Sequence, residues 1–204
     1  MTENQNKVIE LVKQTKPLIF QEMTHEKVTE KGAADYVTNV DVAVQNFLKD
    51  ALAKEFPDIA LIAEEKENLG LDPAKSYWIL DPIDGTTNLI RDYHLSAVSL
   101  GLYENGEITF GVVYNPFTEE LFCGAKGEGA FLNGVPIHVS DQPEFKDAVV
   151  SFGSSPYEKN RAKDLFLVFY NVFMNCADFR RTGSAALDLC YVAAADSMHF
   201  WSRT

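Results

Sequence analysis

The sequence has little cysteine and no long apolar run, and its first residues do not resemble a secretion signal. Its three cysteines, Cys123, Cys176 and Cys190, form no CxxC or Cys/His spacing, which argues against a disulfide framework and a zinc site. This usage favours a reducing compartment, so we expect a cytoplasmic protein. No stretch approaches the roughly 18 apolar residues that a membrane span needs. The polar start MTENQNK also lacks the basic and apolar regions of a signal peptide, and we expect no membrane partner.

Positive charge is also scarce. The chain has 18 Lys and Arg against 30 Asp and Glu, a formal net charge of -12, and no basic patch is visible along it. Such a chain repels phosphate backbones, so we expect no nucleic-acid partner. A small phosphorylated substrate is still compatible with an acidic protein, because bound divalent cations can reverse the local charge.

Apolar spacing predicts a mixture of helices and strands around a long antiparallel meander. One helix, at 7–23, contains Pro17, which would kink or divide it, and a second, at 39–56, ends before Pro57. The meander covers 95–139 and is cut by Asn-Gly and Asn-Pro turn pairs. The other expected elements are strands at 59–63, 77–80 and 148–152, an extended stretch at 178–181, and helices at 161–174 and 183–195.

This order predicts an α+β portion over residues 1–145, carrying helices, meander and acidic site, and the start of an α/β portion over 146–204. The second portion has about 60 residues, near the lower limit for an independent domain, so we expect it to be incomplete. Its aromatic residues at helical spacing are expected in the core; they are Phe166, Phe169, Tyr170 and Phe173.

Two of the predicted strands run directly into acidic residues. Glu64 and Glu65 follow 59–63, and the run DPIDGTTN at 81–88 follows 77–80. Taken singly, each acidic group is typical of an ordinary turn or a solvated loop. Together, and with two threonine hydroxyls added, they exceed what a turn requires.

Asp81 and Asp84 are three residues apart, with the stiff Pro82 between them. Both carboxylates can therefore emerge on one side of a turn at a strand end. Clustered acids without His or Cys favour Mg²⁺ over zinc, since Mg²⁺ prefers hard oxygen ligands and bridges carboxylates to phosphate. Glu64, delivered by a different strand, would complete the site.

The run DPIDGTTN resembles the signature of the inositol monophosphatase family, D-P-[IVL]-D-G-T-x-N. Three further segments agree in order: DYVTNVD at 35–41 with D-x-V-T-x-x-D, AEE at 63–65 with G-E-E, and RRTGSAA at 180–186 with R-x-x-G-[ST]-A-A. The hairpin KGEGAFLNG at 126–134 also fits. The resemblance spans residues 7–194 and implies a layered α/β/α/β/α sandwich, whose C-terminal part we expect to be truncated here.

The resemblance also implies roles for individual residues. Magnesium would be bound by Glu64, Asp81, the Ile83 carbonyl and Asp84, with Glu65 close by but not itself a ligand. The catalytic residues would be Asp41, Glu64 and Thr86, of which Asp41 and Thr86 orient the attacking water. The substrate would contact Asp84, Gly85, Thr86, Ser184 and Ala185. Lithium inhibition and a homodimer are further implications, while Arg180 and Arg181 would either bind phosphate or form a structural ion pair.

The implied activity is Mg²⁺-dependent hydrolysis of small phosphate monoesters, myo-inositol 1-phosphate or related sugar phosphates. Enzymes resembling fructose-1,6-bisphosphatase or 3'-phosphoadenosine 5'-phosphate phosphatase share the D-P-[IVL]-D-G-T core and stay open as alternatives. The family's later W-D motif, whose aspartate ligates a second metal, is absent, since Trp201 is not followed by Asp. The sequence is therefore either part of a longer protein or a variant with a damaged site, and a non-catalytic metal-binding relative is a third reading.

Overall fold

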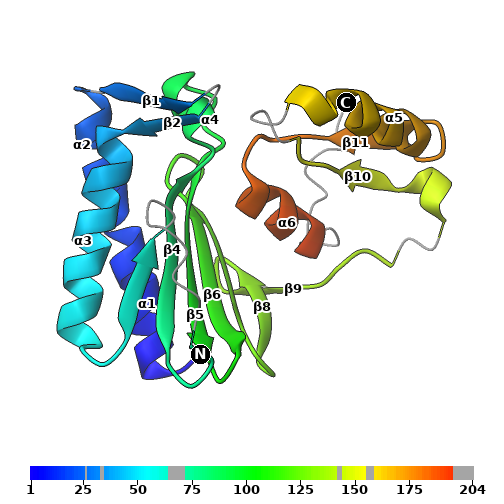
Figure 1. Ribbon diagram of the computed structural model, residues 1–204. Helices are drawn as coiled ribbons and strands as arrows, with labels where there is room; N and C mark the ends of the chain where they lie inside the picture. Colours follow the sequence, from blue (N-terminus) through cyan, green and yellow to red (C-terminus); the bar gives the residue numbers. More distant parts are fainter. Residues whose placement is uncertain (26, 33–34, 64–71, 142–143, 155–158, 195–204) are drawn as a thin grey trace.

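The computed structural model describes residues 1–25, 27–32, 35–63, 72–141, 144–154 and 159–194. Figure 1 shows a large sheet with three helices on one side and a smaller part on the other. The layers run from helices α1–α3 through the large sheet and helix α6 to a small sheet and helix α5. This order matches the layered α/β/α/β/α sandwich that the resemblance implied.

The predicted N-terminal helix is divided into α1 (Glu3–Lys13) and α2 (Thr15–Met23). The break lies at Gln14 and not at Pro17. Pro17 sits in the first turn of α2, where a missing N–H removes no helical hydrogen bond. Thr2 and Gln5 cap the start of α1 reciprocally, which fixes its first residue.

Helix α3 (Asn39–Glu55) confirms the second predicted helix. It follows a hairpin of β1 (Val28–Gly32) and β2 (Asp35–Thr38). Thr38 and Asp41 form a capping box at its start, so the chain turns sharply from strand to helix there. Its buried stripe is Val40, Val44, Leu48 and Leu52.

The large sheet has seven strands in sequence order, and within it β3 and β4 are parallel while all later neighbours are antiparallel. The meander prediction is confirmed. At two hairpins, Asn105-Gly106 and Asn133-Gly134, both residues have positive φ, as tight turns between twisted strands require. The strands are β3 (Ala60–Ala63), β4 (Tyr77–Asp84), β5 (Ala97–Glu104), β6 (Glu107–Asn115), β7 (Glu120–Ala125), β8 (Gly129–Leu132) and β9 (Val135–Ile137).

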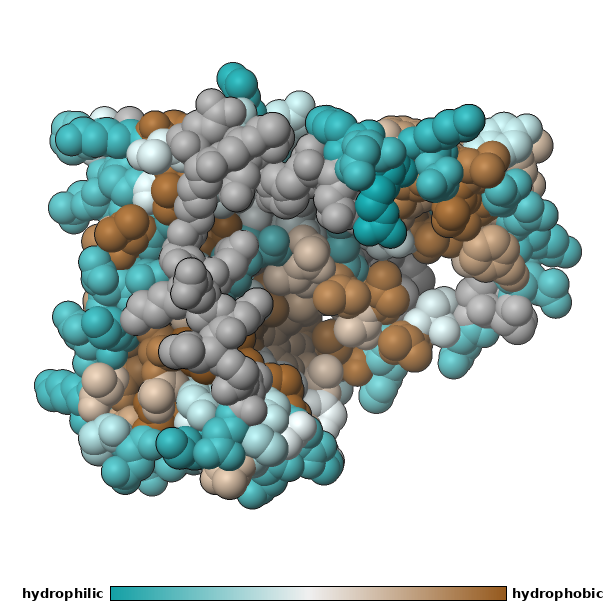
Figure 2. All heavy atoms as spheres, in the orientation of Figure 1, coloured by the Kyte–Doolittle hydropathy of each residue, from teal (hydrophilic) through white to brown (hydrophobic). Residues whose placement is uncertain are grey.

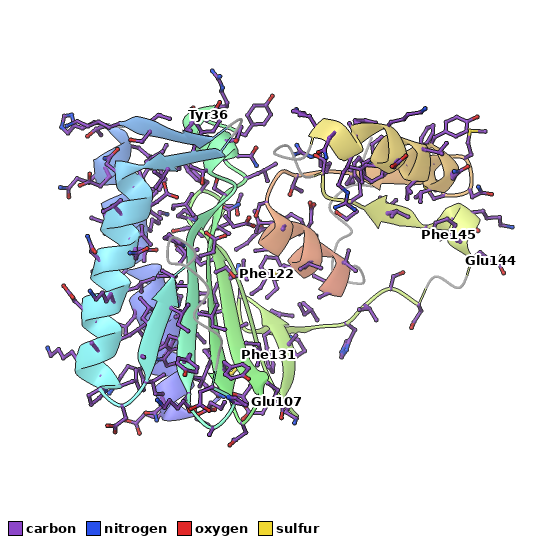
Figure 3. The ribbon with its side chains drawn as sticks, viewed as in Figure 1. Tyr36, Glu107, Phe122, Phe131, Glu144 and Phe145 are labelled. Atoms are coloured by element: carbon purple, nitrogen blue, oxygen red, sulfur yellow. The ribbon has the colours of Figure 1, made fainter. Side chains whose placement is uncertain are left out.

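The two faces of this sheet are covered unequally. The face toward α1–α3 carries the main core, in which Trp78 and Leu100 are almost fully buried against the helices. The opposite face carries a smaller cluster in which Ala97, Phe122 and Leu187 pack together, and Figure 3 shows Phe122 on the side of the sheet that faces α6. The second face is therefore held largely by one helix.

The smaller part contains short strands and two longer helices, close to the predicted positions. Strands β10 and β11 pair in parallel. No helix among the described residues is long and apolar enough to cross a membrane. The division at residue 145 stays a prediction. The elements are η1 (Phe145–Asp147), β10 (Val149–Ser151), η2 (Lys159–Arg161), α5 (Ala162–Phe173), β11 (Asp178–Arg180) and α6 (Ala185–Ala193).

The prediction that the aromatic residues of α5 lie in a core was wrong. The helix contains no buried residue, and Phe166 and Tyr170 are 64% and 60% exposed. Phe169 does contact Phe152, with ring centroids 3.7 Å apart. A sheet of two short strands cannot cover a twelve-residue helix, so the rest of the apolar face is left at the surface. Figure 2 shows apolar residues at the surface of the smaller part, and other apolar residues in the hollow between it and the large sheet.

Candidate functional site

The end of β4 contains a bulge that the sequence did not predict. We expected the strand to end at Leu80, whereas it continues through Asp84. Asp81 pairs with Ser99 and Asp84 with Ala97, so β4 advances three residues while β5 advances two. The extra residue is a β-bulge.

The bulge decides where the two carboxylates point. Residues three apart on a regular strand face opposite sides, because successive side chains alternate. Ser99 and Ala97 are two residues apart on β5, so their side chains lie on the same face of the sheet. Residues paired across two neighbouring strands also project from the same face. Asp81 and Asp84 therefore share a face, as the sequence had predicted on the different ground of a proline-stiffened turn.

This face is the one that α6 covers. Ala97, the partner of Asp84, belongs to the apolar cluster beneath α6. Asp81 lines a cavity of about 630 Å³ whose wall also includes Ala63, Phe122 and Cys190. Ala63, the last residue of β3, pairs with Leu80, the neighbour of Asp81. Glu64, the next predicted ligand, lies outside the described residues.

Asp84 is tied directly to the start of α6. Ser184 Oγ donates to Asp84 Oδ2 at 2.5 Å, and the Ala186 backbone N–H donates to the same oxygen at 2.7 Å. A carboxylate at this end of a helix is stabilised by the helix dipole. Since both donors reach Oδ2, the ligand atom that Asp84 can offer a cation is Oδ1. Ala185, a predicted substrate contact, is the first residue of α6.

Asp41 and Thr86, to which the resemblance assigned the orientation of water, lie side by side. Asp41 is 4% exposed, and its Oδ2 accepts hydrogen bonds from the Thr38 backbone N–H and hydroxyl at 2.8 and 2.6 Å. Thr86 Oγ1 lies 3.4 Å from Asp41 Oδ1 and 3.0 Å from the carbonyl oxygen of Ile83. The single hydroxyl proton can serve one acceptor at a time, so Thr86 can switch between the two.

Gly85 connects the bulge to the short helix α4 (Thr86–Ile90). Its φ is 90°, and a Cβ placed there would lie 2.9 Å from the Leu95 carbonyl oxygen. Its own carbonyl accepts a hydrogen bond from Ser96 Oγ at 2.9 Å. The turn therefore needs glycine both because of its positive φ and because a side chain would clash with the Leu95 carbonyl. Phosphate binding by Gly85 and Thr86 stays a prediction.

Two residues at this turn were given no role from the sequence. Asn88 Nδ2 donates to the carbonyl oxygens of Leu95 and Thr182, at 2.7 and 2.8 Å. Ser96, 1% exposed, holds Gly85. Asn88 belongs to the run DPIDGTTN, so the resemblance marked its position but not its contact 94 residues away. Ser96 carries no local signal.

The contacts of Arg180 and Arg181 favour a structural role over phosphate binding. Arg180 Nη1 lies 2.5 Å from Asp178 Oδ2, and this hydrogen bond lowers the pKa of Asp178. Arg181 Nε donates to Ser154 Oγ at 3.1 Å. Both contacts lie within the smaller part, and neither arginine is directed by them toward Asp84.

The predicted metal site is only partly covered by the described residues. Glu64 and Glu65 lie outside them, and in the remainder no three His, Cys, Asp or Glu side chains are grouped to hold a metal. The donors that are described are two carboxylates and the Ile83 carbonyl, all oxygen. Such a set fits a hard cation such as Mg²⁺ and does not fit a soft one.

Comparison with known proteins agrees with this chemistry. A model of the inositol monophosphatase family matches residues 1–204. The Nus factor SuhB of Pasteurella multocida is 38% identical over 169 residues, 82% of this chain and 63% of that protein. An inositol-1-monophosphatase of Rhizobium meliloti is 36% identical over 184 residues, 90% of this chain and 69% of that protein. The chain thus spans 63% of the length of the SuhB relative.

Solved structures show the same similarity. The extragenic suppressor protein SuhB from Bartonella henselae superposes with a TM-score of 0.87 at 32% identity, over 95% of this chain and 75% of that chain. A dual specific IMPase/NADP phosphatase bound with D-inositol-1-phosphate gives 0.75 at 31% identity, over 88% and 66%. An IMPase/NADP phosphatase complexed with Mg²⁺ and phosphate gives 0.77 at 29% identity, over 88% and 67%.

Proposed function

Since this chain belongs to the inositol monophosphatase family, we propose that it hydrolyses small phosphate monoesters with the help of Mg²⁺. The preferred substrate is myo-inositol 1-phosphate or a related sugar phosphate. The observation that carries the proposal is the bulge of β4, which brings Asp81 and Asp84 to one face of the sheet. A relative of known structure holds Mg²⁺ and phosphate together, which supports this cofactor.

The residues that would hold Mg²⁺ are Asp81, Asp84 through Oδ1, and the Ile83 carbonyl, with Glu64 as the further carboxylate. The chemistry that Mg²⁺ supplies when bound is Lewis-acid chemistry, which activates water and neutralises charge on the phosphoryl oxygens. Asp84 is suited to this task because its other oxygen is fixed by Ser184 and Ala186. A carboxylate held at one oxygen loses little further freedom when the other oxygen binds a cation.

Asp41 and Thr86 would orient the attacking water. When the Thr86 proton points to Asp41 Oδ1, the hydroxyl oxygen presents a lone pair toward the site and can accept from water. Asp41 is buried and fixed by Thr38, so the pair is already arranged before substrate binds. Such a fixed arrangement contributes to catalysis by positioning rather than by forming a covalent intermediate.

Substrate contacts by Gly85, Ser184 and Ala185 are part of the same proposal. Ser184 lies 2.5 Å from Asp84 through its hydroxyl, so a phosphate near Asp84 would also be near the start of α6. The nine-residue helix α6 contributes the positive end of its dipole there, which favours an anion. The cytoplasmic location and the homodimer stay predictions.

A second candidate is a binding role without catalysis. The observation that favours it is the 38% identity to a relative named Nus factor SuhB, which exceeds the 36% identity to the inositol-1-monophosphatase. The two readings differ in what the acidic site must do. In a binding role, substitution of Asp81 would leave partner recognition intact, whereas hydrolysis depends on it.

Phosphate release tests the proposal directly. The protein at its full natural length would be incubated with inositol 1-phosphate, fructose 1,6-bisphosphate, 3'-phosphoadenosine 5'-phosphate and NADP, in Mg²⁺ and in EDTA. We expect release in Mg²⁺, loss in EDTA and recovery when Mg²⁺ is restored, with inositol 1-phosphate among the best substrates. Release at equal rates with and without chelator, or none from any substrate, would reject hydrolysis by this site and favour the binding role.

A further inference from the structure

Asn88 joins three segments that lie far apart in the sequence. Its side-chain amide, on α4, donates to the Leu95 carbonyl at 2.7 Å and to the Thr182 carbonyl at 2.8 Å. Leu95 precedes β5 of the large sheet, while Thr182 follows β11 of the smaller part. One amide group therefore ties the turn after β4 to both the large sheet and the smaller part. Both hydrogens of the amide group are donated to a carbonyl oxygen, whereas a hydroxyl has only one hydrogen to donate.

The loop that Asn88 holds is fitted closely to it. Gly183 has a φ of 90°, and a Cβ built there would lie 2.9 Å from both Asn88 Oδ1 and Asn88 Nδ2. Gly85 meets the same loop from the other side, since a Cβ there would lie 3.3 Å from Ser184 Cβ. Two glycines thus allow the backbone of 182–184 to approach the turn after β4.

A short chain of hydrogen bonds leads from Asn88 to Asp84. The Ser184 N–H donates to Thr182 Oγ1 at 3.2 Å, which fixes Ser184 relative to the carbonyl that Asn88 holds. Ser184 Oγ and the Ala186 N–H then donate to Asp84 Oδ2. Asn88 therefore acts on Asp84 through the loop, without contacting it in any of these bonds.

We propose that Asn88 is a positioning residue that holds the start of α6 against Asp84 and thereby sets the affinity of the site for a divalent cation. Loss of its two hydrogen bonds would release 182–184 and leave Asp84 free to rotate away from the orientation in which Oδ1 faces the site. The effect on metal affinity rests on the proposed function. The effect on the loop does not, because it follows from the contacts of Asn88 alone.

A residue that only stabilises the fold would behave differently. Its loss would lower the free energy of unfolding and leave both the local exchange at α6 and the Mg²⁺ requirement unchanged. Asn171 provides a matched control, since its Nδ2 also donates to a backbone carbonyl, that of Leu167 at 2.9 Å, on the exposed helix α5. The experiment therefore compares Asn88→Ala and Asn88→Ser with Asn171→Ala.

The first measurement is amide hydrogen exchange over 182–188 in the full chain without metal. We expect exchange to accelerate by about tenfold in both Asn88 variants and to stay unchanged in Asn171→Ala. Asn88→Ser introduces no charge and keeps a small polar side chain, so it decides the matter if Asn88→Ala does not fold. Unchanged exchange over 182–188 in a folded Asn88 variant would overturn the proposal.

The second measurement is the Mg²⁺ concentration that gives half-maximal phosphate release from inositol 1-phosphate. We expect it to rise at least several-fold in the Asn88 variants and not in Asn171→Ala, while kcat at saturating Mg²⁺ changes less. An unchanged Mg²⁺ requirement would overturn the metal part of the proposal. If the wild-type chain released no phosphate, the proposed function would fail, and the exchange measurement would still decide whether Asn88 holds the loop.

Discussion

Gly183→Ala tests the close fit between the smaller part and the turn after β4. Gly183 has a φ of 90°, a region that costs an L-residue about 1–2 kcal/mol. The added Cβ would also lie 2.9 Å from the Asn88 amide, below any normal contact. If Asn88 moves away, its two hydrogen bonds are lost at about 1 kcal/mol each. We expect the free energy of unfolding to fall by about 3–4 kcal/mol in total.

Gly127→Ala separates the two contributions. Gly127 has a φ of 79°, but a Cβ there meets nothing within 4 Å, so this substitution carries the backbone cost alone, about 1–2 kcal/mol. Urea unfolding followed by circular dichroism would give both values. In an Asn88→Ala background the cost of Gly183→Ala should fall to that of Gly127→Ala, because the obstructing amide is gone. If Gly183→Ala costs no more than Gly127→Ala in the native background, the close contact is refuted.

Four further predictions concern the site and the surface. Asp84→Asn should keep the fold, because an amide oxygen can replace Oδ2, yet lower kcat in phosphate-release assays by more than about tenfold, or 1.4 kcal/mol of barrier. LiCl should inhibit more strongly than KCl at matched ionic strength, and equal effects would indicate screening alone. Burial raises the pKa of Cys190 from 9.0 to about 12 and also raises the pKa of Tyr191. The unfolded chain therefore loses these protons first, so the free energy of unfolding from urea titrations should fall between about pH 9 and 12. The fall should be up to about 1.4 kcal/mol per pH unit for Cys190 and smaller for the partly exposed Tyr191, and it should be less steep in Tyr191→Phe. The exposed apolar face of α5 should cause self-association in light scattering that Phe166→Ser reduces, and a monodisperse monomer before substitution would contradict this.

Much of the first part of the fold could be predicted from local patterns. Helix α3 has a capping box at its start and a proline beyond its end, and both signals lie within the helix or next to it. The hairpins at Asn105-Gly106 and Asn133-Gly134 depend on two residues that tolerate positive φ. Such features need no knowledge of what the segment packs against.

The features that could not be predicted depend on contacts with residues far away in the sequence. The bulge of β4 exists only in relation to β5, so the sequence of 77–84 does not reveal it. The aromatic spacing of α5 is typical of a buried helix, but burial requires a covering layer that the two strands β10 and β11 do not supply. The hydrogen bond of Asn88 to Thr182 spans 94 residues, and only the folded chain brings its partners together.

The central claim is that Asp81 and Asp84 hold, from one face of the sheet, the cation on which hydrolysis depends. The most direct measurement is a Mg²⁺ titration of phosphate release from inositol 1-phosphate by the wild-type chain and by Asp81→Asn, with circular dichroism confirming that both are folded. We predict release that rises with Mg²⁺ and disappears in EDTA for the wild type, and a large fall in rate or a shift to much higher Mg²⁺ for Asp81→Asn. Superimposable titrations for the two proteins would contradict the claim.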